Sequence, residues 1–239
     1  MDKYKLMSKI YDKIYKNPRY SINYVYQTNL IDRYRTSLRL NKEILDIACG
    51  TGTHIFEFNK KGYNCKGIDI SKTMIKKATI KNRLYNTKFI CKDFNSFETK
   101  NKYDIVICLF NSLPEIIKSN KYTNSVFKKI NKIINKDGLF IFDFFKPNNH
   151  SNQISINKRK LNHETIYSIR DSEVKKSRIY SEYICLTKNY KDYKIYILKL
   201  ERANIKKWDS IIKKNNFKII RKGNLFQKGT IVYILKKIK

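Results

Sequence analysis

The sequence predicts an α/β fold: a doubly wound sheet of seven mostly parallel strands, with an N-terminal helical lid and an antiparallel β insert after the fifth strand. Short apolar runs alternate with segments of helical periodicity between residues 44 and 145. The run at residues 103–110, YDIVICLF, is apolar enough to be buried on both faces, as strands of parallel sheets are. After residue 145 the pattern changes to three alternating segments, which indicates antiparallel strands.

The expected elements follow in chain order. The strands of the sheet are residues 44–48, 65–70, 87–91, 103–110, 139–145, 217–221 and 230–236. The helices are residues 54–61, 72–82, 122–135 and 204–215. Ser71 is placed to cap the helix at 72–82, and Asp137-Gly138 predicts a turn before the fifth strand.

At 239 residues the chain is expected to form one domain with four parts. Residues 1–43 form a lid of two helices divided at Pro18, residues 44–145 the ligand-binding core, residues 146–203 an antiparallel insert on the substrate side, and residues 204–239 the last helix and strands of the core. Within the insert, residues 146–163 predict a polar loop, and the strands are residues 165–170, 178–187 and 193–201. Tyr11, Tyr15, Tyr20 and Tyr24 of the lid would cover a ligand below it, although plain packing is an alternative.

The most informative stretch is ILDIACGTGTHIFEF, residues 44–58. It reads as strand, glycine turn and helix, a cradle in which the backbone approaches a ligand closely and the helix presents free N–H groups. A nicotinamide fold needs a third glycine where Ile55 stands, and the GK[ST] of an ATPase phosphate loop is absent. Asp46, which leads into the turn, suits a positively charged ligand and disfavours a pyrophosphate.

Three further positions fall at the ends of predicted parallel strands, where ligands of such folds bind. Asp69 ends the second strand and is placed to accept hydrogen bonds from both hydroxyls of a ribose. Asp93 and Phe94 follow the third strand and are suited to an adenine, the acid accepting from the exocyclic amine and the ring lying against the base. Residues 110–112, after the fourth strand, are expected to face the active centre.

The formal net charge of +32 raises the question of nucleic acid. The lysines stand singly and in pairs, without a block of five or six, and the bias runs through every segment. Solvated faces are therefore favoured over a nucleic-acid interface, and the positive field would attract a phosphorylated substrate.

The five cysteines show no short spacing of a zinc or redox motif, so no metal is expected. They are interpreted as buried, reduced thiols of a cytoplasmic protein. The N-terminus lacks an apolar stretch of signal-peptide length, and no run approaches the ~20 apolar residues of a membrane span.

Residues 46–52, DIACGTG, resemble motif I of the class I S-adenosylmethionine-dependent methyltransferases, whose sheet is Rossmann-like. Asp69, Asp93-Phe94 and the fourth-strand segment match in order and spacing. The opening YDKIYKNPRY, the string LDIACGTGTH and the C-terminal ILKLERANIKKWDSIIKKNNFKII are similar to small-molecule N-methyltransferases, most of all to N,N-dimethyltransferases of nucleotide-linked aminosugars. Glycine and sarcosine N-methyltransferases share the turn more distantly.

The resemblance implies the cofactor S-adenosyl-L-methionine and a set of residues that bind it. These are Tyr11, Tyr20, Asp46, Ala48, Gly50, Thr51, Gly52, Asp69, Ile70, Asp93, Phe94 and Leu109. Gly50 and Gly52 would meet the methionine part, and Tyr11 and Tyr20 would close over the donor. Ala48 departs from the general motif, because it stands at the first glycine position.

The expected reaction is methyl transfer to a small molecule, and the expected partners are a nucleotide diphosphate sugar or other small amine and a second copy in a homodimer. Positioning can supply ~7–11 kcal/mol of a barrier, so Tyr11 is the candidate positioning residue and Asn111 the candidate substrate contact. His54 is expected to pack more than to act as a base. Lys146, Arg159 and Arg170 are candidates for a diphosphate.

Two alternatives stay open. One is an RNA or protein methyltransferase that uses the basic surface, although the fourth-strand segment LFNSLP lacks an NPPY-type loop. The other is a binding module without catalysis, against which the complete set of acids and glycines argues.

Overall fold

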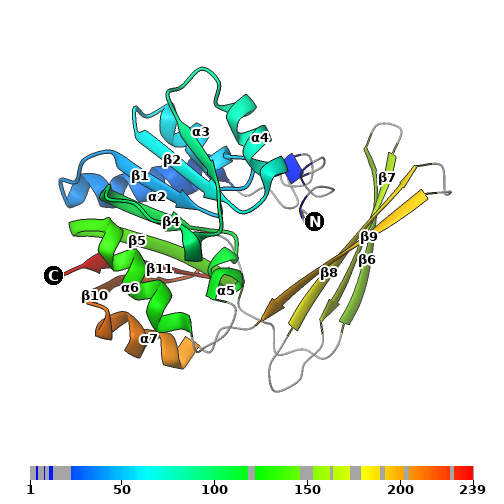
Figure 1. Ribbon diagram of the computed structural model, residues 1–239. Helices are drawn as coiled ribbons and strands as arrows, with labels where there is room; N and C mark the ends of the chain where they lie inside the picture. Colours follow the sequence, from blue (N-terminus) through cyan, green and yellow to red (C-terminus); the bar gives the residue numbers. More distant parts are fainter. Residues whose placement is uncertain are drawn as a thin grey trace. The chain divides into compact units, whose positions relative to one another are not determined.

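Figure 1 shows the structure, a computed structural model. It describes residues 4, 8, 11–12, 23–117, 122–145, 153–161, 164–172, 179–188, 192–201, 205–226 and 229–238, with the side chains of residues 145–207 left out of the description. The chain divides into two compact units, residues 1–146 with 204–239, and residues 147–203.

The first unit contains the predicted seven-stranded sheet. Its strands are β1 (Glu43–Ile47), β2 (Asn64–Asp69), β3 (Lys88–Cys91), β4 (Tyr103–Cys108), β5 (Ile134–Phe145), β10 (Phe217–Gly223) and β11 (Thr230–Lys237). They lie in the order β10-β11-β5-β4-β1-β2-β3. The five strands from β3 to β5 are parallel, and β11 runs antiparallel to both β5 and β10. The doubly wound, mostly parallel sheet is thus confirmed.

Helices cover both faces of this sheet (Figure 1). They are α2 (Tyr24–Ser37), α3 (Thr53–Asn59), α4 (Lys72–Lys81), α5 (Ser112–Ile117), α6 (Thr123–Ile133) and α7 (Ile205–Lys214). The helices α2, α3 and α4 neighbour one another on one face, and α5, α6 and α7 do so on the other. The hydroxyl of Ser71 accepts a hydrogen bond from the N–H of Met74, which confirms the predicted cap of α4.

The core forms because apolar strands are buried on both faces. All six residues of β4 are buried, and so are the last four of β1. On the α6 and α7 side, Trp208 packs against Phe127, Phe142 and Phe144. No helix among the described residues is both long and apolar enough to cross a membrane.

Ile55 stands where a nicotinamide fold would have a small residue, and Gly67 of β2 explains how it fits. A Cβ on Gly67 would lie 2.7 Å from Cδ1 of Ile55 and 2.8 Å from Sγ of Cys49. Ile55 itself is fully buried. The close packing of helix on strand is therefore made by a glycine in the strand instead of one in the helix.

One local prediction in the first unit was wrong, and one helix was not predicted. The turn expected at Asp137-Gly138 lies inside β5, because Ile134 pairs with Tyr103 of β4 and the ladder resumes only at Leu139. Asp137 has the left-handed backbone that the Asp-Gly pair predicts (φ +64°), but it forms a bulge within the strand. The short helix α5 was not predicted either.

The second unit is an antiparallel sheet, as predicted, but it has four strands instead of the three expected. Its strands are β6 (Gln153–Leu161), β7 (Glu164–Ser172), β8 (Ile179–Lys188) and β9 (Asp192–Glu201), in that order. The loop predicted at 146–163 was wrong in its second half, because β6 pairs with β7 from Gln153 to Leu161. Backbone pairing stabilises this strand, although the run of Asn, Lys and Arg at residues 157–160 hides its alternation.

Candidate functional site

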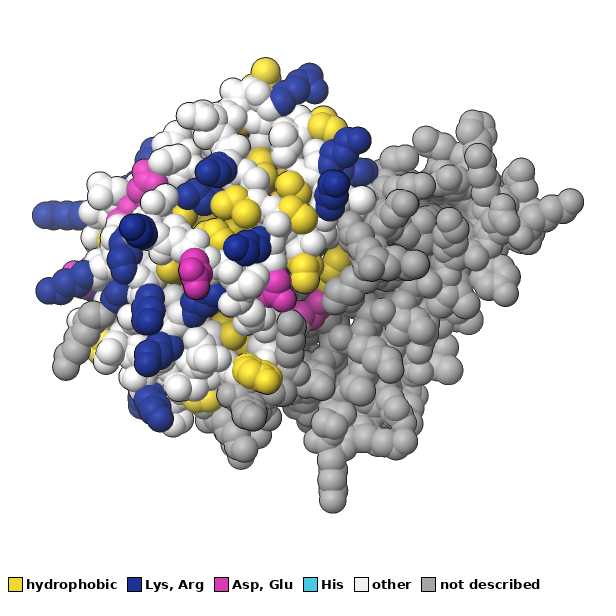
Figure 2. Space-filling view, viewed as in Figure 1, with side chains coloured by type: hydrophobic (Ala, Val, Ile, Leu, Met, Phe, Trp, Pro, Cys, Tyr) yellow, Lys and Arg dark blue, Asp and Glu magenta, His cyan; other side chains and the backbone are white. Residues whose placement is uncertain are grey.

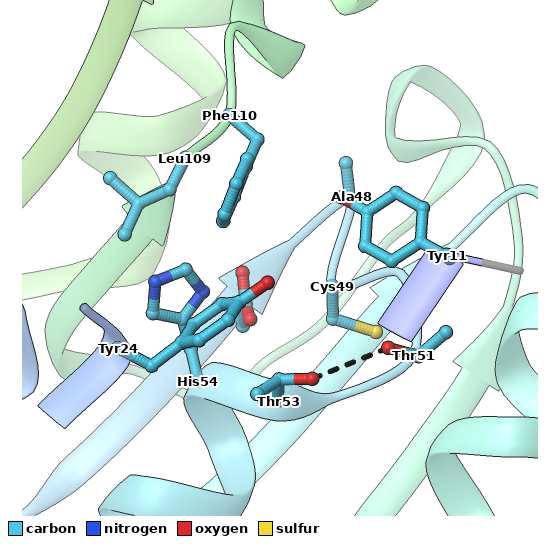
Figure 3. Close-up of a pocket in the computed structure, with 10 residues that line it drawn as sticks. Tyr11, Tyr24, Ala48, Cys49, Thr51, Thr53, His54, Leu109 and Phe110 are labelled. Carbon is cyan, nitrogen blue, oxygen red and sulfur yellow. Dashed lines mark hydrogen bonds between the residues drawn. The ribbon is translucent and has the colours of Figure 1, made fainter. Parts of the chain in front are cut away.

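A pocket opens at the carboxyl ends of β1 and β4, where the glycine turn leads into α3 (Figure 3). It is lined by Tyr11, Tyr24, Asp46, Ala48, Cys49, Thr51, Thr53, His54, Leu109 and Phe110. The ring of Tyr11 stands on one side, and Tyr24 and His54 face it from the other. The pocket lies at the predicted edge of the sheet.

The turn itself is built from left-handed backbone. Ala48, Gly50 and Gly52 have φ values of +59°, +54° and +71°. The conformation is open to glycine but costs roughly 1–2 kcal/mol for a residue with a Cβ, so Ala48 carries strain that a glycine there would avoid. A Cβ on Gly50 would meet no atom within 4 Å, whereas one on Gly52 would lie 2.9 Å from Nδ2 of Asn82 in the chain after α4.

Asp69 holds the turn against the end of β2. Its Oδ2 accepts a hydrogen bond of 2.9 Å from the N–H of Gly50, and its Oδ1 accepts one of 2.8 Å from the N–H of Ser71. Both oxygens of Asp69 therefore accept from the backbone, one from the glycine turn and one from the cap of α4.

Asp46 presents a buried carboxylate to the pocket. It is only 2% exposed, and its Oδ2 has no hydrogen-bond partner among the described residues. Burial, and then the negative charge of Asp69, raise the pKa of Asp46 well above its usual value. A buried, unpaired carboxylate is costly, and a cationic ligand group would relieve that cost.

The opposite wall is aromatic. The ring of Tyr24 lies 4.9 Å from the imidazole of His54, edge to face, and 5.7 Å from the ring of Phe110. Nε2 of His54 lies 2.7 Å from Oε1 of Gln27. Burial, and then the charge of Lys81, lower the pKa of His54 to about 3. His54 is therefore a neutral packing residue and a poor base.

The loop after β4 is held by a second buried acid. Phe110 and Asn111 have φ values of +64° and +58°, and the N–H of Asn111 donates to Oδ1 of Asp143 over 2.8 Å. Burial raises the pKa of Asp143 to about 7, while backbone N–H groups, including those of Asn111 and Phe110, lower it in part. Two consecutive residues are thus kept in an unfavourable conformation at the pocket wall.

The model of a methyltransferase domain family matches residues 38–222, which include the turn, the pocket wall after β4 and the acids that hold both. The chain belongs to the methyltransferase domain family. The resemblance to the class I S-adenosylmethionine-dependent methyltransferases is confirmed.

The methyltransferase domain is similar to proteins from three bacteria. It is 29% identical over 86 residues to the dTDP-3-amino-3,4,6-trideoxy-alpha-D-glucopyranose N,N-dimethyltransferase of Streptomyces venezuelae, covering 36% of this chain and 35% of the relative. The chain spans less than two thirds of the length of the curated relatives that it matches. A crystal structure of an S-adenosylmethionine-dependent methyltransferase from Clostridium acetobutylicum superposes with a TM-score of 0.79 at 20% identity, covering 97% of this chain and 99% of that one. A third protein, an amino pentose methyltransferase from Micromonospora echinaspora with S-adenosylmethionine bound, gives a TM-score of 0.79 at 14% identity, covering 95% and 96%. At these identities the two structures show the fold.

The methyltransferase domain brings together part of the predicted site. Tyr11, Asp46, Ala48, Thr51 and Leu109 line the pocket. Gly50, Gly52 and Asp69 build the turn beside it, and Asn111 follows Phe110 in the wall.

The residues predicted for the adenine lie elsewhere on the same edge. Asp93 caps a short 3-10 helix, Phe94–Ser96, by accepting from the N–H of Asn95 over 2.9 Å. Phe94 is buried under the ammonium of Lys129, 5.2 Å from the ring centroid. Ile70 is 57% exposed. None of these three side chains is among those that line the pocket.

Some predictions fall outside the described residues. Tyr15 and Tyr20 do so, as do Lys146 and the side chains of Arg159 and Arg170.

Sequence reasoning missed three charged residues of this methyltransferase domain. Asp143 had a signal, since it is a lone acid in the apolar run LFIFDFF. Asp12 and Lys81 had none, because an ion pair between residues 69 positions apart leaves no mark on either segment.

Proposed function

We propose that this protein transfers methyl groups from S-adenosylmethionine to the amino group of a small molecule, with a nucleotide-linked aminosugar as the first candidate. The observation that carries the proposal is Oδ2 of Asp46, which lies in a pocket beside the glycine turn and has no hydrogen-bond partner among the described residues.

The residues of the pocket fit this donor. When bound, S-adenosylmethionine supplies a methyl group on a positively charged sulfur, and it carries an ammonium group as well. Asp46 would hold the ammonium group, the open backbone at Gly50 would admit the methionine part, and Asp69 would accept from the ribose. Asp93 and Phe94 remain the candidates for the adenine, and Tyr11 would stand over the donor.

An amine acceptor needs orientation more than activation. The described wall offers Tyr24 and Phe110 as ring faces, which attract a cationic or partly charged amine. Asn111 remains the proposed acceptor contact. With a pKa of about 3, His54 would not take the proton of the amine, so we assign proton removal to water.

Two of the comparisons support an aminosugar. The relative from Streptomyces venezuelae is named for an amino-trideoxy-glucopyranose and the structure from Micromonospora echinaspora for an amino pentose. We assign the choice of acceptor to the antiparallel unit, residues 147–203, as the sequence predicts. A cytoplasmic location fits Cys49, Cys65, Cys91 and Cys108, which are all free thiols.

The test is an acceptor screen by mass spectrometry. Purified protein is incubated with the donor and a panel of nucleoside diphosphate sugars, each amino sugar paired with its hydroxyl analogue. We expect the mass of one or two methyl groups on the amino sugars alone. Methylation of the hydroxyl analogues, or of none of the panel, would contradict the acceptor class.

The net charge of +32 supports one second candidate, methylation of RNA. Figure 2 shows Lys and Arg spread over the visible face and mixed with other side chains, which favours the small-molecule proposal. A salt-sensitive gel shift with RNA, together with transfer of labelled methyl groups to RNA, would favour the second candidate instead.

A further inference from the structure

Two described residues near the N-terminus, Tyr4 and Asp12, contact helices that follow different strands of the sheet. The hydroxyl of Tyr4 donates to Oε2 of Glu115 in α5, which follows β4, over 2.5 Å. Asp12 contacts Lys81 at the end of α4, which follows β2. In the sheet, β1, which carries Asp46, lies between β2 and β4.

The second contact is a compact cluster of four side chains, here called the clasp: Asp12, Thr51, Thr53 and Lys81. The ammonium group of Lys81 lies 2.8 Å from Oδ2 and 2.9 Å from Oδ1 of Asp12. It also donates to the hydroxyls of Thr51 and Thr53 over 3.0 and 2.6 Å. The hydroxyl of Thr51 in turn donates to Oδ1 of Asp12 over 2.6 Å.

The clasp joins three parts of the chain through one ammonium group. Asp12 lies near the N-terminus. Thr51 lies in the glycine turn, Thr53 is the first residue of α3, and Lys81 is the last residue of α4. The side chains of Lys81 and Asp12 are 21% and 30% exposed, so the ion pair is partly screened by solvent and by salt.

The clasp bears on the pocket because Asp12 is next in sequence to Tyr11, which lines it. The ring of Tyr11 lines the pocket opposite Tyr24 and His54, and Thr51 and Thr53 line it from below (Figure 3). Lys81 does not line the pocket, yet it holds both the residue next to Tyr11 and the turn that Tyr11 faces.

We propose that Lys81 is a positioning residue of the donor site: through Asp12 it holds the neighbouring Tyr11 in place beside the glycine turn, so that loss of the clasp speeds the release of donor and product. The role rests on the proposed function, because it assumes that the pocket holds the donor. Lys81 acts through Asp12, Thr51 and Thr53 and touches no reacting atom.

The experiment measures the dissociation rate of S-adenosylhomocysteine by stopped flow, with Lys81→Met and Asp12→Asn as the variants. We expect each to raise the dissociation rate about three- to tenfold, the range of a partly exposed charge-assisted contact. The KM for the donor should rise with kcat unchanged. The matched control is Lys60→Met, which breaks the ion pair between Lys60, the residue after α3, and Glu57 in α3, and it should change neither.

Two readouts separate positioning from general destabilisation. Raising the salt concentration should speed dissociation from the wild type but not from Lys81→Met, because only the former has the ion pair to screen. The exchanged pair Asp12→Lys with Lys81→Asp should restore slow dissociation, since threonine hydroxyls both donate and accept.

Equal dissociation rates in the wild type and Lys81→Met overturn the proposal. An exchanged pair that releases the product as fast as the single variants overturns it as well. Amide hydrogen exchange at residues 51–53 in the free protein is a separate arm, and it should be faster in Lys81→Met. If the wild type does not bind S-adenosylhomocysteine, the proposed function is wrong. If amide hydrogen exchange at residues 51–53 is the same in Lys81→Met as in the wild type, the proposed role of the clasp is wrong.

Discussion

The backbone N–H of Gly50 donates a hydrogen bond of 2.9 Å to Oδ2 of Asp69, which joins the glycine turn to the carboxyl end of β2. The same carboxylate accepts from the N–H of Ser71, the cap of α4. Asp69 therefore organises the backbone of the turn before any ligand arrives. A role with the ribose would add to this structural one.

We predict that Asp69→Asn destabilises the protein without any ligand. An amide has one acceptor oxygen, so it cannot accept from both Gly50 and Ser71 with charge-assisted bonds. The loss should be about 1.5–3 kcal/mol in the free energy of unfolding. Urea unfolding measures it; an unchanged midpoint would show that Asp69 serves a ligand alone.

The two glycines of the turn should respond differently to alanine. Gly50→Ala adds a Cβ in open space, so it should cost about 1–2 kcal/mol of backbone strain and interfere with the donor. Gly52→Ala adds the same strain and a contact of 2.9 Å with Asn82, and overpacking costs a further ~1–3 kcal/mol. In thermal unfolding, the melting temperature of Gly52→Ala should therefore be lower than that of Gly50→Ala, and the reverse order would contradict the packing described.

Ala48→Gly should leave stability unchanged or raise it by up to about 1 kcal/mol. The left-handed backbone at Ala48 strains an alanine, whereas a glycine relieves the strain and loses some of the gain to chain entropy. Denaturant unfolding measures the difference. A clear loss of stability would mean that the methyl group of Ala48 packs usefully in the pocket.

Stability should fall as the pH rises from about 4 to 7 through Asp143. Its pKa is raised from 3.8 to about 7 in the folded protein, so the folded state holds a proton that the unfolded state has released. The stabilising effect is complete below pH 4 and is lost as the pH passes 7. Urea unfolding across this range measures it.

The matched variant for this pH dependence is Asp143→Asn, whose Oδ1 can still accept from the N–H of Asn111. We expect it to remove this part of the slope between pH 4 and 7 and to be more stable than the wild type near pH 8. Identical pH slopes in the two proteins would exclude Asp143 as the titrating group.

Much of the fold was predictable because buried parallel strands leave continuous apolar runs, and YDIVICLF became β4. The glycine turn was predictable because its acid and glycines are adjacent in sequence. The packing of Ile55 against Gly67 was not, since it joins a helix to a strand. The strand β6 was missed because its charged residues mask a ladder made by the backbone.

The candidate site was predictable only where it is local. Asp46 and the turn were found from one stretch of sequence. In contrast, the hydrogen bond between Asp143 and Asn111 joins residues 32 positions apart, and the one between Lys81 and Asp12 joins residues 69 positions apart. Hydrogen bonds of this kind depend on strands and helices that become neighbours only after folding. Asp143 could be noticed in the sequence as an acid in an apolar strand, but its partner Asn111 could not be identified from it.

The central claim is that the buried carboxylate of Asp46 meets a cationic methyl donor. Calorimetric titration with S-adenosylmethionine, repeated at several pH values with the wild type and Asp46→Asn, tests it most directly. Because the raised pKa keeps the free carboxyl protonated at low pH, we predict that the wild type binds one donor per chain with proton release and with affinity that rises with pH. Asp46→Asn should bind at least about tenfold more weakly and lose that pH dependence, since a charged hydrogen bond contributes roughly 1.5–3 kcal/mol. A wild type that gives no binding heat, or a variant that binds as tightly as the wild type at every pH, would contradict the claim.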